Sequence, residues 1–301
     1  MGFSMFKNKM IIYLAVIFCL IMVTLPEITA DASKAAISLW LNAVVPTLFP
    51  FIIMANFIQR TGIVRRMPMG IYPFVMALLS GYPMGARITA DAYRSGYIDQ
   101  QNLPRILSYS MITGPAFLIG AVGVNFFHSQ MSGYILAVSH YSGALLNSLF
   151  YGGIFINNPS IPRGSCRLGD SYGEYLTDSI LDGFKTIGII LAYIMMFMIG
   201  TDLLQFSGFF RLIEGDYTAA LLKGMLEMTV GCNALSSCQC SMMTKLVLSS
   251  FLISFGGFSV MGQTMSMLKG CPIKLTQLIK MKLTHGIISG ILAFTICAFV
   301  V

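Results

Sequence analysis

The chain has 301 residues, of which 56% are hydrophobic and 10% are charged. Soluble domains carry roughly 25% charged residues, so this chain has too little polar surface to cover itself in water and is expected to lie in a lipid bilayer. The same lack of charge excludes a disordered chain, a coiled coil and a nucleic-acid-binding protein. The formal net charge of +7 is interpreted as the cytoplasmic excess of Lys and Arg found in membrane-protein loops.

Nine apolar segments follow one another along the chain, and a membrane-spanning helix needs about 20 residues. They cover residues 10–25, 35–58, 71–93, 103–127, 131–156, 177–204, 217–237, 243–268 and 275–301. The first is interpreted as an uncleaved helix, because the second apolar segment begins directly after the small residues near position 30 where a signal peptidase would cut. The pattern predicts an all-α polytopic integral membrane protein.

Two of these segments are poor spanning helices because charged residues and glycines interrupt them. The interrupting residues are Gly81, Tyr82, Pro83, Gly85, Arg87 and Asp91 in segment 71–93, and Lys223, Gly224, Glu227, Gly231 and Asn233 in segment 217–237. A charge near the bilayer centre costs at least about 2.5 kcal/mol, so neither segment is expected to face lipid. Both are predicted to be re-entrant helical hairpins, which return the chain to the side it came from.

The loop charges fit this topology when Lys7 and Lys9 are placed in the cytoplasm. The cytoplasmic side then holds Arg60, Arg65, Arg66, Arg94, Arg105, Arg163, Arg167, Lys269, Lys274, Lys280 and Lys282. The opposite side holds Glu27, Asp31, Lys34, Arg211, Glu214, Asp216 and Lys245. Nearly all of the positive excess is therefore cytoplasmic, as the charge rule for membrane proteins requires.

An internal repeat emerges when the chain is shifted by about 142 residues, which lays Gly114 over Gly256 and residues 50–54 over 192–196. The order helix, interrupted hairpin and glycine-broken helix then occurs twice, with opposite topology. We expect an N-terminal helix and loop (1–34), a first repeat with the following helix (35–156), a polar cytoplasmic linker (157–176), a second repeat (177–268) and a C-terminal helix (269–301). Inverted repeats with broken helices are typical of secondary transporters.

The tip of the first hairpin is a candidate substrate-binding site. Gly81, Tyr82, Pro83 and Gly85 end one helix and start the next, which leaves free backbone N–H groups at a partially positive helix end. Arg87 follows directly and can grip a carboxylate with two hydrogen bonds. The alternative is that Arg87 pairs with Asp91 one turn later and only anchors the hairpin.

The two predicted helix breaks are further candidates for substrate binding. Thr113, Gly114 and Pro115 form the first, and Gly256 and Gly257 with the nearby Gln263 form the second. Pro115 lacks a backbone donor, so a carbonyl is left for water, a ligand or a neighbouring helix to satisfy. The alternative is close helix packing through small residues.

Glu227 is the one carboxylate well inside the second hairpin, and it is a candidate for binding a coupling cation or carrying a proton. Together with Asp91 and Asn233 it forms the predicted coupling or gating set. The alternative is that Glu227 pairs with Lys223 one turn earlier. No nucleophile and base pair stands out, and the cysteines lack metal-ligand spacing, so no enzyme activity, metal or cofactor is expected.

The chain resembles the YlbJ-type sporulation integral membrane proteins, within the nucleoside-recognition or Gate domain group. The resemblance lies in Val45-Pro46-Thr47-Leu48-Phe49-Pro50-Phe51, Ser80-Gly81-Tyr82-Pro83-Met84-Gly85-Ala86-Arg87, residues 91–96 with Ile98, Gly114-Pro115-Ala116-Phe117 and Gly120-Ala121-Val122-Gly123. A weaker likeness continues through Glu227, Gly231, Phe255-Gly256-Gly257-Phe258 and Gln263. The chain is shorter than the members expected, and its cysteine-rich stretch 232–240 is not part of the family pattern.

The resemblance implies a transporter of endospore formers that moves dipicolinic acid across the outer forespore membrane by alternating access. Its expected partners are a small organic anion and the lipid bilayer, and a homo-oligomer is left open. One alternative is a nucleoside or purine transporter, which the name of the Gate group suggests. Another is a non-transporting membrane component of a spore-maturation complex.

Overall fold

The computed structural model describes residues 2–61, 67–154 and 172–300. Arg65, Arg66, Arg163, Arg167 and most of the expected linker 157–176 lie outside the described residues. All elements in the described ranges are helices, which confirms the all-α prediction.

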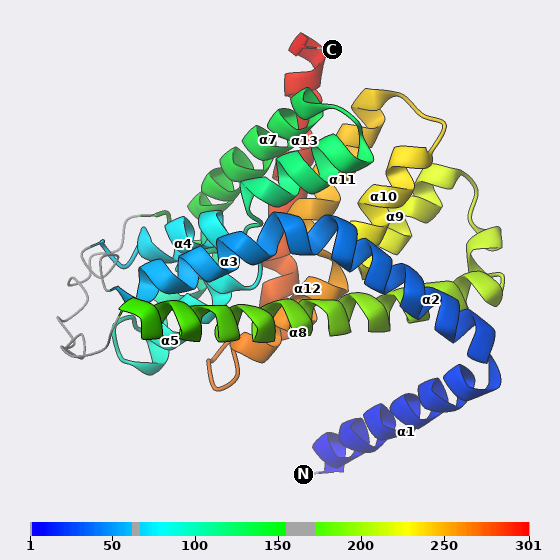
Figure 1. The fold of residues 1–301 in the computed structure, drawn as a ribbon, viewed down its shortest axis with the longest axis horizontal. Helices are drawn as coiled ribbons and strands as arrows, with labels where there is room; N and C mark the ends of the chain where they lie inside the picture. The colour runs from blue at the N-terminus through cyan, green and yellow to red at the C-terminus, as the bar shows by residue number, and fades with distance from the viewer. Residues whose placement is uncertain (1, 62–66, 155–171, 301) are drawn as a thin grey trace.

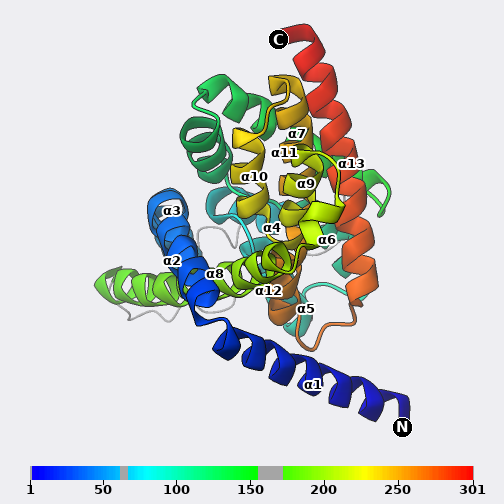
Figure 2. The same cartoon turned by 90° about the vertical axis from the view of Figure 1, so that its right-hand side faces the viewer.

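The first half of the chain begins with α1 (Gly2–Thr24), which projects away from the rest of the molecule (Figures 1 and 2). α2 (Pro26–Leu39), the π-helical turn η1 (Trp40–Val44) and α3 (Val45–Arg60) then form one continuous helix of 35 residues. Pro46 and Pro50 have no backbone N–H to donate to the carbonyls one turn earlier. The long helix is bent as a result, as Figure 1 shows.

Short elements complete the first half. They are α4 (Tyr72–Ser80), α5 (Met84–Arg94), α6 (Asn102–Ser110), the π-helix η3 (Ala116–Phe126) and α7 (Gln130–Leu149). α4 ends because Gly81 adopts φ +73°, a left-handed conformation that a residue with a Cβ rarely takes. Residues 111–114 between α6 and η3 are not helical, and they include Thr113 and Gly114, while Pro115 directly precedes η3.

The second half repeats this order of elements. It consists of α8 (Tyr172–Phe206), the short 3-10 helix η4 (Phe209–Leu212), α9 (Asp216–Leu226), α10 (Met228–Ser237), α11 (Met242–Phe255), α12 (Gly257–Met267) and α13 (Leu275–Val300). Glu227 separates α9 from α10 in an extended conformation, and Gly256 separates α11 from α12 at φ +85°. Each half therefore contains a long helix, a pair of short helices, a broken helix and a closing helix.

The two halves pack against each other in a paired way. α2 and α3 lie beside α8, and the closing helices α7 and α13 lie together. η3 of the first half contacts α10 of the second, while α12 of the second half contacts α5 of the first. α3 and α8 run in opposite directions, because Arg60 at the end of α3 contacts Asp178 and Asp182 near the start of α8 (Figure 1).

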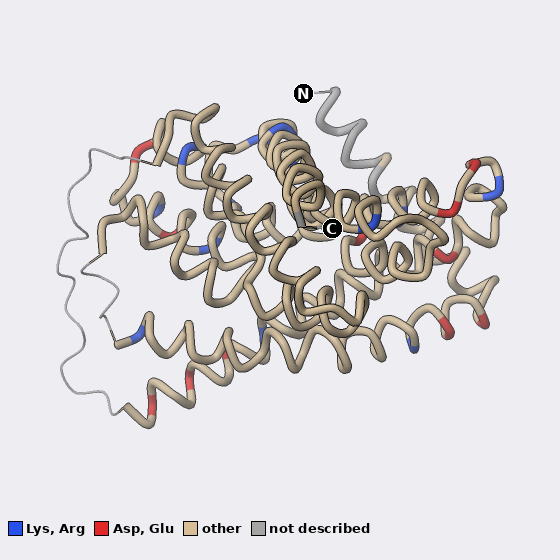
Figure 3. Tube along the Cα trace, turned by 90° about the horizontal axis from the view of Figure 1, so that it is seen from above, with Lys and Arg blue, Asp and Glu red and all other residues tan. Residues whose placement is uncertain are grey.

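Four helical stretches of the described residues are long and apolar enough to cross a membrane. They are Pro26–Arg60, Tyr172–Phe206, Met242–Met267 and Leu275–Phe299. α7 has 20 residues but is not among them, because it carries Ser139, His140 and Asn147, all fully buried. Most charged positions lie toward the two ends of the long helices rather than over the middle (Figure 3). The fold is that of a polytopic membrane protein with a partly polar interior.

Candidate functional site

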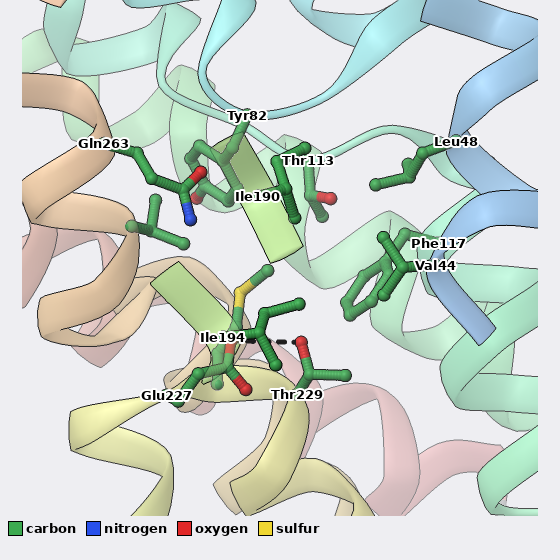
Figure 4. Close-up of a pocket in the computed structure, with 12 residues that line it drawn as sticks. Val44, Leu48, Tyr82, Thr113, Phe117, Ile190, Ile194, Glu227, Thr229 and Gln263 are labelled. Carbon is green, nitrogen blue, oxygen red and sulfur yellow. Dashed lines mark hydrogen bonds between the residues drawn. The ribbon is translucent and has the colours of Figure 1, made fainter. Parts of the chain in front are cut away.

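A small cavity of about 30 Å³ lies where the two halves meet. Its lining comes from both long helices, both pairs of short helices and both broken helices: Val44, Leu48, Tyr82, Thr113, Phe117, Ile190, Ile194, Glu227, Met228, Thr229, Val260 and Gln263. Figure 4 shows Tyr82 and Thr113 on one side of this space and Glu227 and Thr229 on the other. A cavity needs about 10–15 Å³ to hold one water molecule, so this one holds about two waters and is closed to larger molecules.

Close packing of glycines brings the first hairpin tip onto the first helix break. A Cβ on Gly81 would lie 3.0 Å from the backbone nitrogen of Gly114. Any side chain at Gly81 would therefore push the tip away from the break. With both glycines in place, Tyr82 and Thr113 share one wall of the cavity. Gly85, one turn later, faces the carbonyl of Ser110 so closely that an added Cβ would overlap it.

The second hairpin tip is built around Glu227, which caps α10. One oxygen of its carboxylate accepts a hydrogen bond from the backbone nitrogen of Val230 (2.8 Å), and the other accepts from the Thr229 hydroxyl (3.2 Å). Such capping satisfies a helix N-H group that would otherwise be unpaired. Glu227 is 2% exposed and forms no ion pair within the described part of the chain. It is the one acidic residue of the cavity lining.

The second helix break packs onto this tip as the first break does onto the other. Gly257 has φ +71°, and a Cβ there would lie 3.0 Å from the carbonyl oxygen of Gly224. Gln263, nearly two turns further along α12, lines the cavity, and its amide lies 3.5 Å from the Ser259 hydroxyl. The two breaks and the two tips thus surround one space.

Arg87 lies in a different place, one turn into α5 and facing the long helices. It lines an open pocket of about 240 Å³ together with Asn56, Gln59, Arg60 and Asp182. Arg87 makes no hydrogen bond or ion pair with any residue that the structure describes.

Asp91 and Asn233 also lie outside the cavity. Asp91 pairs with Arg94 at 2.9 Å rather than with Arg87. Asn233 is exposed on α10.

A second open pocket, of about 430 Å³, lies at the other end of α8. Its lining includes Gln205 of α8, Arg211, Asp216 and Lys223. The Lys223 ammonium stands 5.2 Å from the centre of the Phe210 ring and does not pair with Glu227. Along α8, Asp182 belongs to the first pocket, Ile190 and Ile194 to the cavity, and Gln205 to the second pocket.

Lys282 was expected among the cytoplasmic loop charges, and the structure places it elsewhere. Lys282 is 2% exposed on α13, and its ammonium donates hydrogen bonds to the Tyr82 hydroxyl and to the Met111 carbonyl (3.0 Å). The Tyr82 hydroxyl donates in turn to the carbonyl of Ile253 (3.2 Å). Lys282 therefore links the first tip to both broken helices.

Two histidines complete this polar interior. The backbone nitrogen of Thr113 donates to Nε2 of His140 (3.1 Å), and Nδ1 of His140 lies 2.7 Å from the Ser254 hydroxyl. Nε2 of His285 lies 3.0 Å from the His140 carbonyl. The bond from Thr113 satisfies a backbone N–H group freed by the first break, as a membrane interior requires. In the sequence, His140 and His285 are marked only as polar residues inside apolar segments.

No group of three or more His, Cys, Asp or Glu residues in the described ranges has a geometry that could hold a metal ion.

The chain is 27% identical over 313 residues to the sporulation integral membrane protein YlbJ of Bacillus subtilis (strain 168), covering 88% of this chain and 77% of that protein. No family model matches the chain. No solved structure matches it. The similarity to YlbJ confirms the family resemblance drawn from the hairpin and helix-break residues.

Proposed function

From its place in the YlbJ-type family of sporulation integral membrane proteins, we propose that this chain is a secondary transporter that moves a small organic anion by alternating access. The observation that carries the proposal is a closed cavity between two open polar pockets along one helix. Asp182 and Gln205 mark the two pockets, and at 1.5 Å per residue they are about 35 Å apart along α8. The hydrocarbon core of a bilayer is about 30 Å thick, so the pockets fit opposite faces of a membrane.

The paired architecture supports a two-state mechanism. α4 and α5 have 9 and 11 residues, and at 1.5 Å per residue they reach only about 14 and 17 Å, too short to cross the core. We infer that this pair and the matching pair α9 and α10 are re-entrant hairpins in two inverted repeats. The opposite directions of α3 and α8 fit the inversion. Two similar units can exchange conformations, which gives inward-open and outward-open states of comparable energy.

The family suggests dipicolinic acid as the substrate and the outer forespore membrane as the location. Dipicolinate is a planar dianion, and its export from a negative interior is downhill in the membrane potential. Arg87, which has no partner in the described structure, is proposed to receive a carboxylate in the open pocket beside the amides of Asn56 and Gln59. Thr113 and Gln263 then hold the anion in the widened cavity.

Glu227 is proposed to couple or gate this movement. A carboxylate in the cavity repels an anion, so Glu227 must take up a proton or a cation when the substrate enters. Its hydrogen bonds to Val230 and Thr229 hold the group in place at the tip.

A nucleoside or purine is the second candidate substrate. The cavity lining offers neutral groups that suit a nucleobase, namely the Gln263 amide and the hydroxyls of Tyr82, Thr113 and Thr229, whereas Arg87 lies outside it. A ligand held through these groups would depend on Gln263 more than on Arg87.

The test is efflux of dipicolinate from liposomes that contain the purified protein, read outside by terbium luminescence. Release should require the protein and fall in Arg87→Ala and Gln263→Ala, while Arg211→Ala, in the opposite pocket, tests whether both pockets contribute. Absence of release from folded, inserted protein would contradict the anion proposal. Radiolabelled nucleosides in the same liposomes then test the second candidate.

A further inference from the structure

Lys282 is a buried lysine without an acidic partner in the described part of the chain. No carboxylate of the described residues pairs with it, and its ammonium contacts neutral groups, the Tyr82 hydroxyl and the Met111 carbonyl. It also stands 4.5 Å from the centre of the Tyr82 ring. His140 and His285 lie close enough to interact with it electrostatically, and neither adds negative charge. A buried lysine without a counter-charge is unfavourable in its protonated form, so the charged form needs an anion beside it.

Every contact of Lys282 leads to the wall of the central cavity. Tyr82 is itself a lining residue. Met111 comes two residues before Thr113, which lines the cavity. A Cβ on Gly256 would lie 3.5 Å from Cε of Lys282, and one helical turn beyond Gly256 comes the lining residue Val260. Lys282 therefore stands directly behind the wall that the two helix breaks form.

Lys282 is the basic side chain that the structure places behind this wall. Its lining contains one acidic residue, Glu227, and no basic one, and Arg87 faces a separate pocket. In the membrane interior, where the effective dielectric constant is low, a charge behind the wall acts strongly on a ligand in the cavity. An anion in the cavity would therefore gain electrostatic binding energy from Lys282, and a neutral molecule of the same shape would not.

We propose that Lys282 makes the central cavity select anions, because it is protonated when an anion occupies the cavity and a carboxylate of the bound substrate supplies its counter-charge. This inference rests on the proposed function and names the specificity-determining residue of the same cavity. Lys282 acts on the substrate electrostatically from behind the cavity wall. Tyr82 lies between them, because it contacts Lys282 and also lines the cavity. Its hydrogen bonds to the two halves have a separate, positioning effect.

Charge and hydrogen bonding can be separated by substitution. Lys282→Arg keeps the charge, Lys282→Gln keeps a hydrogen-bond donor without charge, and Lys282→Met removes both. Lys245→Gln is the matched control, because Lys245 also donates to a backbone carbonyl, that of Ser236 (2.7 Å), but Ser236 does not line the cavity, whereas the Lys282 partner Tyr82 does. The probes are pyridine-2,6-dicarboxylate and its neutral diamide, which have the same shape.

The measurement is thermal stabilisation of the full-length protein in detergent by each probe. The wild type, Lys282→Arg and Lys245→Gln should respond to the dicarboxylate at about tenfold lower concentration than to the diamide. A tenfold difference in affinity is about the effect expected from one favourable charge interaction. Lys282→Gln should lose this preference, and its diamide response should stay within about twofold of the wild type. Lys282→Met should match Lys282→Gln.

Three outcomes would overturn the inference. If Lys282→Gln keeps the dicarboxylate preference, the charge is not the selecting feature, even if Lys282→Met fails to fold. If the wild type responds to the diamide alone, the cavity does not select anions. If the wild type responds to neither probe, the proposed function itself fails. If instead the wild type and Lys282→Gln both prefer the dicarboxylate, only the role of Lys282 fails.

Discussion

Arg60 and Asp182 form an ion pair, with Nη2 of the arginine 2.7 Å from Oδ2 of the carboxylate, that joins the end of α3 to the beginning of α8. Arg60 also reaches Asp178 at 3.1 Å. Both ion pairs border the pocket in which Arg87 lies, so the charges of this pocket balance only while Arg60 is present.

Arg60→Gln is expected to slow anion transport with little loss of stability. Removing Arg60 leaves Asp178 and Asp182 unpaired, which makes the pocket repel anions. The pairs are partly exposed, so the free energy of unfolding should change by less than about 1 kcal/mol. The double variant Arg60→Gln/Asp182→Asn should recover much of the rate in the liposome assay. An unchanged rate in the single variant would mean that anions do not enter through this pocket.

Gly257→Ala is expected to destabilise the protein. Gly257 has φ +71° and its neighbours leave no room for a Cβ, so alanine should cost about 1–3 kcal/mol. Gly188→Ala in α8 is the matched control, because no atom lies within 4 Å of the added Cβ and its effect should stay within about 0.5 kcal/mol. Thermal unfolding in detergent compares the two. Equal melting temperatures would contradict the close packing of the second tip on the second break.

Glu227→Gln is expected to separate folding from coupling. The glutamine carbonyl can still accept from the Val230 nitrogen, so the cap of α10 is kept, whereas Glu227→Ala should lose about 1 kcal/mol of stability. Transport by Glu227→Gln should no longer respond to an imposed proton or sodium gradient. Gradient-driven accumulation that survives in this variant would exclude Glu227 as the coupling group.

Cys271 allows a test of topology and of local electrostatics together. It lies between α12 and α13, and burial raises the pKa of its thiol, with the Asp91 carboxylate raising the pKa further and Arg94 opposing. Because the thiolate is the reactive form, maleimide labelling of a variant with this cysteine alone should be slow at neutral pH and should rise about tenfold per pH unit below the pKa.

The same labelling has a built-in control. Asp91→Asn removes a negative charge and should lower the pKa of Cys271, so labelling at neutral pH should be faster. The loop-charge topology expects an impermeant maleimide to reach Cys271 from the cytoplasmic side only. Labelling from the opposite side would reverse the assigned orientation.

The sequence was informative wherever a local rule applies. Gly81, Pro115, Glu227 and Gly256 interrupt apolar segments, and the structure has a break at or beside each. Such residues act on their own backbone, so their effect is visible in the chain order. The four long apolar stretches follow from composition in the same way.

The contacts between distant residues could not be predicted. Lys282 and Tyr82 are 200 positions apart, and a lysine near the start of a helix has the same pattern whether it faces a loop or the interior. The direction of Arg87 depends on the rotation of α5, since one residue changes the facing side by about 100°. The sequence thus predicted which segments meet at the cavity more readily than which side chains point into it.

The single tryptophan of the chain lies on the seam between the long helices, where the indole Nε1 of Trp40 donates to the carbonyl of Ile187 at 3.0 Å. Its emission therefore comes from one contact between the two halves, with no second indole to obscure it. Any rearrangement that slides η1 past α8 must break or lengthen this hydrogen bond and alter the polarity around the ring. The intrinsic fluorescence of Trp40 should therefore report relative motion between the two halves in the unlabelled protein during transport.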